Sequence, residues 1–262
     1  MKPEEPPSDG PGQATVKRYV DDEHVSLFVR GHFGAMFKAY CDHVRLWQEL
    51  PDGLSLVMMR QALGAASLHL SCRPTDETTA WTLNVKTPPL NLFVTGDAAG
   101  CNVTGRVFTE GVETAGSSRL FVESRRARGE PYRSVIDVTG LDVLDIFEQF
   151  SRRSDQNHAR YFELEQDDYL MVVGFPGSSG EWLQSLERGT AAARYRELPT
   201  LLDQKTFWFK CGCHFDRILE VVRQLYGDRP EELFRGESHV DVFCPRCGRR
   251  WALARERFDH AG

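Results

Sequence analysis

The sequence predicts an α+β core domain, a short helical linker and a small C-terminal domain that carries four of the seven cysteines. Three observations lead to this prediction. Apolar residues recur at helical spacing in two early segments, short β-rich runs dominate the middle of the chain, and four cysteines crowd its last fifth. With 262 residues, of which 41% are hydrophobic, the chain is long enough to bury a sizeable core.

Charge and segment composition narrow the classes of function. The formal net charge of −6 disfavours a dedicated nucleic-acid binder, which normally carries a basic balance. No apolar run approaches the roughly 18 residues of a membrane helix, and the first residues lack the apolar core of a secretory signal. We therefore expect a cytoplasmic protein with no membrane partner. Because that compartment is reducing, clustered cysteines are more typical there of a metal site or a redox centre than of structural disulfides.

The core domain is expected over residues 16–177, after a disordered Pro-rich tail over residues 1–15. Two helices come first, at Phe33–Trp47 and Leu54–Leu70, and a third is expected over Leu141–Arg152. Because most of the strands follow the first helices and pair with their neighbours, an α+β domain is favoured over a doubly wound sheet. The expected strands are Trp81–Val85, Leu90–Val94, Asn102–Val107, Leu120–Ser124, Tyr132–Val138, Tyr161–Leu164 and Tyr169–Phe175.

A breaker at Pro176–Gly180 ends the core, so residues 16–177 are expected to fold alone. The linker is assigned to residues 178–206. It holds two weak helical patterns, at Trp182–Leu186 and Ala191–Leu198, each too short to be stable without packing partners. The C-terminal domain is then assigned to residues 207–262.

The C-terminal cysteines form two closely spaced pairs. Cys211-Gly-Cys213 is followed, after thirty residues, by Cys244-Pro-Arg-Cys247-Gly248. Two such pairs supply four thiolates, the donor set that suits tetrahedral zinc. We therefore predict a four-cysteine zinc-binding domain with one zinc ion per reduced chain, held by Cys211, Cys213, Cys244 and Cys247. His214 and His239 are weaker candidates as ligands, and Cys41, Cys72 and Cys101 are expected to be small buried apolar residues.

The metal site alone leaves its role open between a structural staple and a switch. Most four-cysteine zinc sites are structural. A Cys-x-Cys disulfide would close a tight ring and be easily reduced, which suits a reversible switch. Cationic neighbours of the sulfurs would favour thiolates. These neighbours are Lys210, His214, Arg246, Arg249 and Arg250.

Motifs in the core, together with the cysteine pattern, resemble the redox-regulated heat shock protein 33 family of disulfide-bond chaperones. Ser154-Asp155-Gln156 is similar to the Ser-Glu-Gln element of that family. Pro88–Leu92 and Val103–Val107 resemble its central strand pair, and Arg60–Leu68 stands where the family has a helix rich in small residues. Residues 177–210 form a shorter linker than is typical of the family.

The resemblance implies an ATP-independent holdase chaperone that is zinc-bound and inactive when reduced. It implies oxidation to two disulfides, Cys211–Cys213 and Cys244–Cys247, with zinc release, binding of unfolding client proteins, and a homodimer in the oxidised state. The reduced C-terminal domain is expected to fold against the linker, whose Trp182, Leu183 and Leu186 become exposed on oxidation with Phe215, Ile218 and Leu219 of the domain itself.

Two alternatives to a switch remain. The sequence has no nucleophile elbow, zinc-protease motif, phosphate-binding loop or dinucleotide fingerprint, so an enzyme is not expected. A zinc-ribbon module that binds nucleic acid or a partner protein without redox switching is favoured by Arg246, Arg249, Arg250 and Trp251. It is disfavoured by the weak charge of residues 205–262, where eleven Lys and Arg face nine Asp and Glu. A structural interaction module would keep its zinc under oxidants.

Overall fold

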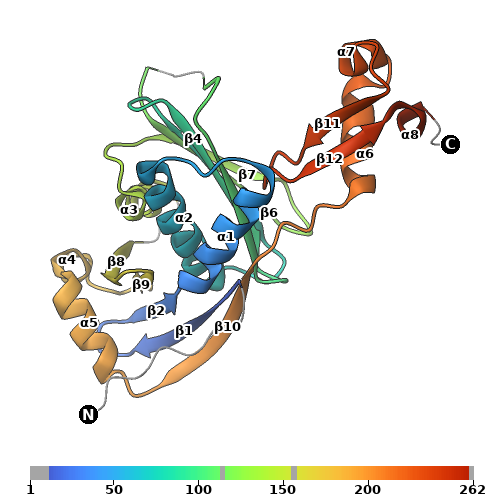
Figure 1. Cartoon of the computed structure of the whole chain (residues 1–262). Helices are drawn as coiled ribbons and strands as arrows, with labels where there is room; N and C mark the ends of the chain where they lie inside the picture. Colours follow the sequence, from blue (N-terminus) through green and yellow to red (C-terminus); the bar gives the residue numbers. More distant parts are fainter. Residues whose placement is uncertain (1–11, 113–115, 155–157, 260–262) are drawn as a thin grey trace.

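The computed structural model describes residues 12–112, 116–154 and 158–259 (Figure 1). Residues 1–11 of the expected disordered tail lie outside the described residues, whereas residues 13–15 belong to the first strand, so the core begins earlier than expected. Asp155 and Gln156 of the family-like element also lie outside the described residues. Within the described ranges, no helix is long and apolar enough to cross a membrane.

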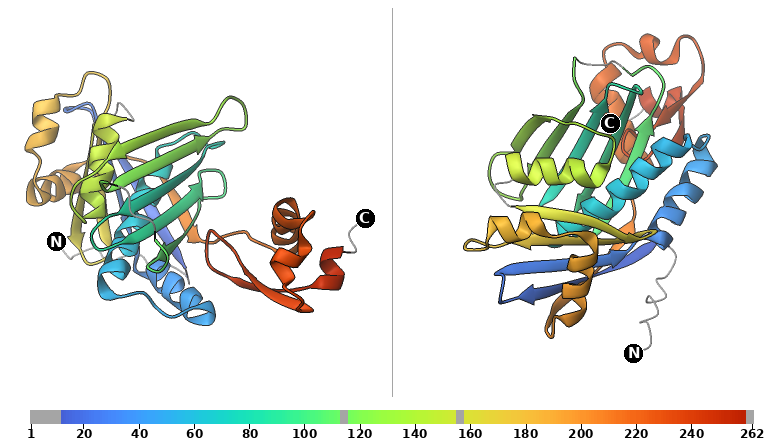
Figure 2. Two further views of the ribbon diagram at one scale, coloured as in Figure 1. Left: turned by 90° about the horizontal axis from the view of Figure 1, so that it is seen from above. Right: turned by 90° about the vertical axis from the view of Figure 1, so that its left-hand side faces the viewer.

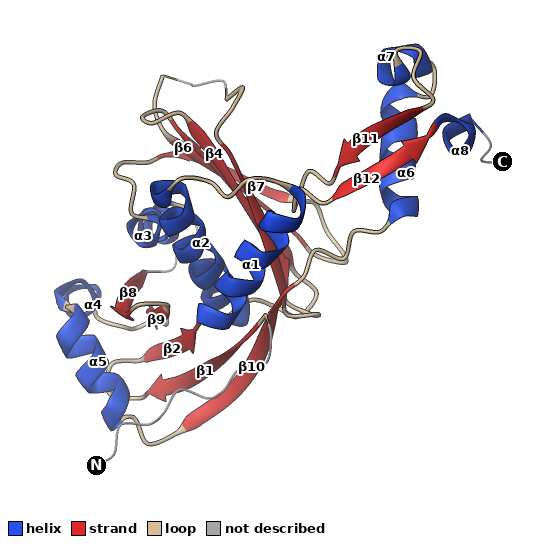
Figure 3. Cartoon of the chain, viewed as in Figure 1, coloured by secondary structure: helices blue, strands red, loops and turns tan. Residues whose placement is uncertain are grey.

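A ten-stranded sheet forms the main body and is built from segments far apart in the chain (Figure 3). Its strand order is β7-β6-β3-β4-β5-β10-β1-β2-β9-β8. The first half of the chain contributes β1 (Gln13–Asp21), β2 (Ser26–His32), α1 (Gly34–Trp47), α2 (Gly53–Ser71), β3 (Thr78–Val85), β4 (Leu90–Asp97), β5 (Asn102–Phe108), β6 (Arg119–Arg125) and β7 (Tyr132–Asp137). The second half contributes α3 (Val143–Arg153), β8 (Ala159–Glu165), β9 (Asp168–Gly174), α4 (Gly180–Ser185), α5 (Arg188–Glu197) and β10 (Leu201–Phe209).

Helix α2 lies at the centre of the core, with fourteen of its nineteen residues buried. Asp52 caps its first turn by accepting a hydrogen bond from the backbone N–H of Ser55 at 2.7 Å. Small residues let the helix approach the sheet closely, because a Cβ at Gly64 would lie 2.4 Å from the ring of Tyr169. Helices α1, α2 and α3 together cover one face of the sheet.

The half of the sheet containing β2, β8 and β9 is covered on both faces because its side chains alternate. Leu27, Tyr161 and Met171 face the main core, whereas Phe28 and Phe162 face a second apolar cluster beneath α4 and α5. These two linker helices thus pack on the sheet and not on the C-terminal domain. Figure 2 shows the linker helices and the C-terminal domain at opposite ends of the molecule. The expectation that the C-terminal domain folds against the linker is therefore wrong.

Strand β10 is the main departure from the expected organisation. Its residues 201–206 fall in the segment assigned to the linker, yet the strand lies inside the main sheet. It pairs antiparallel with β1 and runs parallel to β5 at Trp208 and Phe209. The centre of β10 is polar, so its sequence does not alternate clearly. An ion pair between Arg18 on β1 and Asp203 stabilises the pairing.

The C-terminal domain has a small core of its own. It comprises α6 (Phe215–Tyr226), α7 (Pro230–Phe234), β11 (His239–Phe243), β12 (Arg250–Ala254) and α8 (Arg255–Asp259). One face of α6 supplies part of this core, with Ile218, Leu219 and Val222 buried, whereas Leu225 is exposed. The rest of this core is formed by Phe234, Leu253, Phe258 and two cysteines, Cys244 and Cys247. Strands β11 and β12 form an antiparallel hairpin whose turn carries these cysteines.

Candidate metal centre

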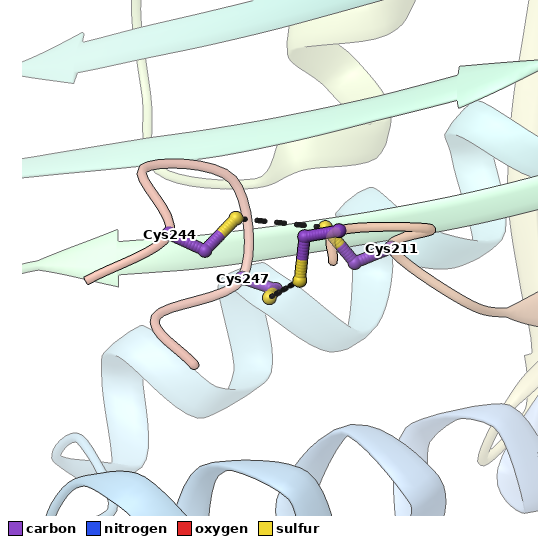
Figure 4. Close-up of side chains that lie close together, drawn as sticks. Cys211, Cys244 and Cys247 are labelled. Carbon is purple, nitrogen blue, oxygen red and sulfur yellow. Dashed lines mark hydrogen bonds between the residues drawn. The ribbon is translucent and has the colours of Figure 1, made fainter. Parts of the chain in front are cut away.

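Two chain segments meet to bring the four predicted cysteines together (Figure 4). Cys211 and Cys213 follow β10 directly, and Gly212 between them has a φ of +64°, which suits glycine. Cys244 and Cys247 lie in the turn between β11 and β12. We call Cys244–Gly248 the knuckle and the four cysteines the cysteine cluster. In the knuckle, the N–H of Gly248 donates to the carbonyl of Cys244 at 2.8 Å, which closes the turn.

The spacing of the sulfurs fits a tetrahedral cation. All four sulfurs lie within 4.8 Å of one another. The Sγ atoms of Cys211 and Cys244 are 3.7 Å apart, and those of Cys213 and Cys247 are also 3.7 Å apart. A tetrahedron with metal–sulfur bonds of about 2.3 Å has edges of about 3.8 Å. The cluster therefore has both the donors and the spacing that a zinc ion requires.

The electrostatics of the cluster also call for a cation. Hydrogen bonding from Cys211 and Cys247 holds the pKa of the Cys244 thiol well below its ordinary value. The same contacts with Cys244 raise the pKa of Cys211 to about 12. The pKa of Cys247 is raised too, through its hydrogen bonds with Cys211 and Cys244. One thiolate is thus stabilised at the expense of its neighbours, so four thiolates need a positive charge between them.

The other sequence candidates lie outside this cluster. His214 caps α6 through its ring Nδ1, and the ring of His239 contacts Ser238. Cys41 is buried as expected, whereas Cys72 and Cys101 are half-buried. Of the cations expected around the sulfurs, two have other partners: the guanidinium of Arg249 lies 4.3 Å from the ring centroid of Trp251, and Arg250 pairs with Asp241.

The core supplies neighbours of the cluster that sequence reasoning missed. The Nε2 atom of His43 on α1 lies 3.0 Å from the carbonyl oxygen of Cys247. Just beyond α1, Gln48 donates from its side-chain amide to the carbonyl of Gly248 at 3.1 Å. Arg106 on β5 interacts electrostatically with Cys244 and Cys247. These residues stand 138 to 204 positions before the knuckle residues that they approach, and no sequence signal joins them.

The linker helices are held on the sheet by polar contacts as well as by the apolar cluster. Arg194 on α5 donates to both carboxylate oxygens of Asp21, at 2.8 and 2.6 Å. The ring of His24 stacks on Trp182 of α4 with centroids 4.0 Å apart. Both anchoring residues of the sheet lie at the β1–β2 turn. The apolar cluster beneath consists of Phe28, Phe162, Leu170, Val172, Leu183, Leu186, Ala191 and Leu198.

Two curated proteins of one kind, both 33 kDa chaperonins, are similar to this chain in sequence. No family model matches the chain. The chain is 21% identical over 165 residues to a 33 kDa chaperonin of Nitrosococcus oceani, a match covering 55% of this chain and 57% of that protein. It is 22% identical over 162 residues to a 33 kDa chaperonin of Pectobacterium carotovorum subsp. carotovorum, covering 52% and 56%. These matches thus span little more than half the length of the curated relatives.

The likeness in fold extends further than the likeness in sequence. The crystal structure of a 33 kDa chaperonin, a heat shock protein 33 homologue from Thermotoga maritima, matches with a TM-score of 0.69. This match covers 94% of the present chain and 96% of that one, at 14% sequence identity. The resemblance that the motifs indicate, to the heat shock protein 33 family of chaperones and not to a family of enzymes, is thereby confirmed in sequence and in fold.

Proposed function

We propose that this protein is a redox-regulated, ATP-independent holdase chaperone of the cytoplasm, inactive when reduced and activated when its cysteine cluster is oxidised. The observation that supports this most directly is the meeting of four thiols, spaced for one tetrahedral cation, in a chain with the fold of heat shock protein 33. In the reduced state one zinc ion is held by the thiolates of Cys211, Cys213, Cys244 and Cys247. The small C-terminal domain buries too few side chains to fold without the metal, so bound zinc supplies much of its stability.

Oxidation removes the ligands on which that stability depends. Two molecules of hydrogen peroxide take four electrons from the four thiolates and four protons from solvent, and leave as four waters. The resemblance pairs Cys211 with Cys213 and Cys244 with Cys247 in two disulfides. Disulfide sulfurs are poor ligands, so the ion is released. Its contribution, of the order of 10 kcal/mol for structural zinc, is lost with it.

The unfolding signal reaches the linker helices through β10. This strand joins α5 to Cys211 and pairs with β5 only at its last residues, Trp208 and Phe209. When the C-terminal domain loosens, the end of β10 becomes free to move, and this movement is passed along the strand to α5, a short helix whose position depends on packing. Separation of α4 and α5 from the sheet exposes Trp182, Leu183 and Leu186 along with the strand residues beneath them. Exposed apolar surface of this kind binds unfolding client proteins and pairs with a second copy, giving a homodimer.

The test is the aggregation of a heat-unfolded reporter enzyme in the presence of reduced or peroxide-treated protein. Protection is expected from the oxidised protein alone, together with release of one zinc ion per chain, measured with a metal-binding dye. A Cys211→Ser Cys213→Ser variant, which lacks two of the four ligands, should bind no zinc and should protect the reporter even without peroxide. The matched control is Cys72→Ser, which replaces a cysteine outside the cluster, at the C-terminal end of α2, and should behave as wild type.

Two outcomes would contradict the proposal. Equal protection by reduced and oxidised protein would refute redox control. Protection by neither, with zinc retained under peroxide, would favour the zinc-ribbon interaction module.

A further inference from the structure

The core carries a receptor for the knuckle, formed by the end of α1 and the neighbouring strand β5. His43 and Gln48 contact the carbonyl oxygens of Cys247 and Gly248, at 3.0 and 3.1 Å. The approach is close, because a Cβ at Gly248 would lie 1.7 Å from the side-chain nitrogen of Gln48 and 3.2 Å from Nε of Arg106. Both contacts are made to backbone carbonyl oxygens of the knuckle and not to the sulfurs themselves.

Arg106 is the charged member of this receptor, and its surroundings are unusual for an arginine. Its guanidinium lies over the ring of Phe108, 4.5 Å from the centroid. The Nε atom is buried and has no hydrogen-bond partner. Burial lowers the pKa of Arg106, whereas the sulfurs of Cys244 and Cys247 raise it. Among the residues that the structure describes, no carboxylate contributes to this balance.

Other arginines on the same face of the sheet have ordinary partners. Arg119 on β6 pairs with Asp137 at 3.1 Å, and Arg133 on β7 pairs with Glu123 at 2.7 Å. A partly desolvated guanidinium without a carboxylate is costly unless another anion lies near. For Arg106, the near anionic groups are the cysteines of the cluster.

The charge of the cluster depends on its chemical state. Four thiolates around a dication carry a net charge of −2, whereas two disulfides carry none. We propose that Arg106 senses this charge, holding the knuckle on the core while the cluster is anionic and releasing it when the cysteines are oxidised. This inference rests on the proposed function and adds the residue through which the core detects the state of the cluster.

The physical basis is the desolvation of the guanidinium. Next to an anionic cluster, Arg106 recovers in Coulomb attraction what it loses by leaving water. Next to neutral disulfides it recovers nothing, and the contact is relieved only when the knuckle moves away and water returns. Loss of the negative charge of the cluster is therefore enough to release the knuckle from the core. Loss of zinc adds a second effect, because it destabilises the fold of the C-terminal domain.

The test is hydrogen–deuterium exchange on the full-length, reduced, zinc-loaded protein, read in peptides covering residues 39–50 and 243–252. In Arg106→Gln, exchange in these peptides should be at least about tenfold faster than in wild type, as expected for removing one partner of a partly buried charge pair. Arg106→Lys keeps the charge and should restore much of the protection. Arg119→Gln is the matched control on the same face and should leave both peptides unchanged.

Peroxide treatment completes the comparison. It should accelerate exchange in wild type and in Arg106→Lys, but add little in the α1 peptide of Arg106→Gln, where the knuckle has already left. Wild-type protection in reduced Arg106→Gln would overturn the inference, as would an equal effect in Arg119→Gln.

Failure of the proposed function is recognised separately in the same samples, from zinc content and disulfide mapping. If peroxide forms no disulfides but reduced Arg106→Gln still undocks, the redox switch is refuted and the role of Arg106 stands. If the reduced chain binds no zinc and Arg106→Gln exchanges like wild type, both are refuted.

Discussion

Replacing Asp21 with asparagine should open the linker helices without any oxidant. Asp21 ends β1, and its side chain is 1% exposed. It accepts two hydrogen bonds from Arg194 on α5 and lies 2.9 Å from Nδ1 of His24, the residue whose ring stacks on Trp182 of α4. The carboxylate thus joins both linker helices to the β1–β2 turn. Asp21→Asn keeps the shape and removes the charge.

The pKa of Asp21 gives the magnitude of this effect. Burial acts to raise the pKa, but the hydrogen bonds from Arg194 and His24 outweigh it and lower the pKa from 3.8 to about 2. At about 1.4 kcal/mol per pKa unit, the folded state favours the charged carboxylate by about 2 kcal/mol. Because the folded pKa is the lower one, this stabilisation is complete above about pH 4 and is lost as the pH falls toward 2.

The loss of this stabilisation in Asp21→Asn should increase the fraction of molecules in which α4 and α5 have left the sheet. The helices have only six and ten residues, so their position depends on packing and on this anchor. A loss of about 2 kcal/mol raises the open population about 30-fold. Exchange in peptides covering residues 180–198 of the reduced protein should accelerate accordingly, with increased binding of an apolar dye. The exposed pair of Lys38 and Asp42 provides the control, Asp42→Asn. If Asp21→Asn exchanges like this control, Asp21 does not anchor the linker helices.

Three further predictions concern the C-terminal domain and its attachment. Gly248→Ala should release the knuckle from the core while zinc stays bound, because the added methyl would overlap Gln48 and the φ of +75° disfavours alanine. Hydrogen–deuterium exchange in α1 tests this, and an unchanged exchange rate would contradict it. Chelation of the metal should unfold residues 211–259 and leave the main sheet intact, as followed by circular dichroism and proteolysis; a domain that resists proteolysis after chelation would show that zinc is dispensable for its fold. A chain ending at Lys210 should be more stable to urea than one ending at Gly177, which lacks β10 and leaves the edge of β1 unpaired; equal stability would instead support the boundary expected from the sequence.

Local patterns account for the parts of the fold that the sequence predicted well. The helices expected at Phe33–Trp47, Leu54–Leu70 and Leu141–Arg152 are observed within two residues of those bounds. Their periodicity and caps are contained in the segment itself. The middle strands are also confirmed, because each has a clear β-rich run and a turn signal beside it. Strands β1 and β2, by contrast, precede the first helix and were not predicted, since charged residues interrupt the alternation of β1.

The cysteine spacing determined, from the sequence alone, that four sulfurs would meet, because short pairs are already close and a small domain brings them together. What the cluster rests against was decided only by the tertiary structure. His43, Gln48 and Arg106 reach the knuckle from α1 and β5 across a long stretch of chain. The place of β10 in the main sheet has the same origin, since its polar centre becomes a strand only when β1 supplies Arg18 and a free edge. Contacts between distant segments depend on how the whole chain packs, and no local pattern of residues encodes them.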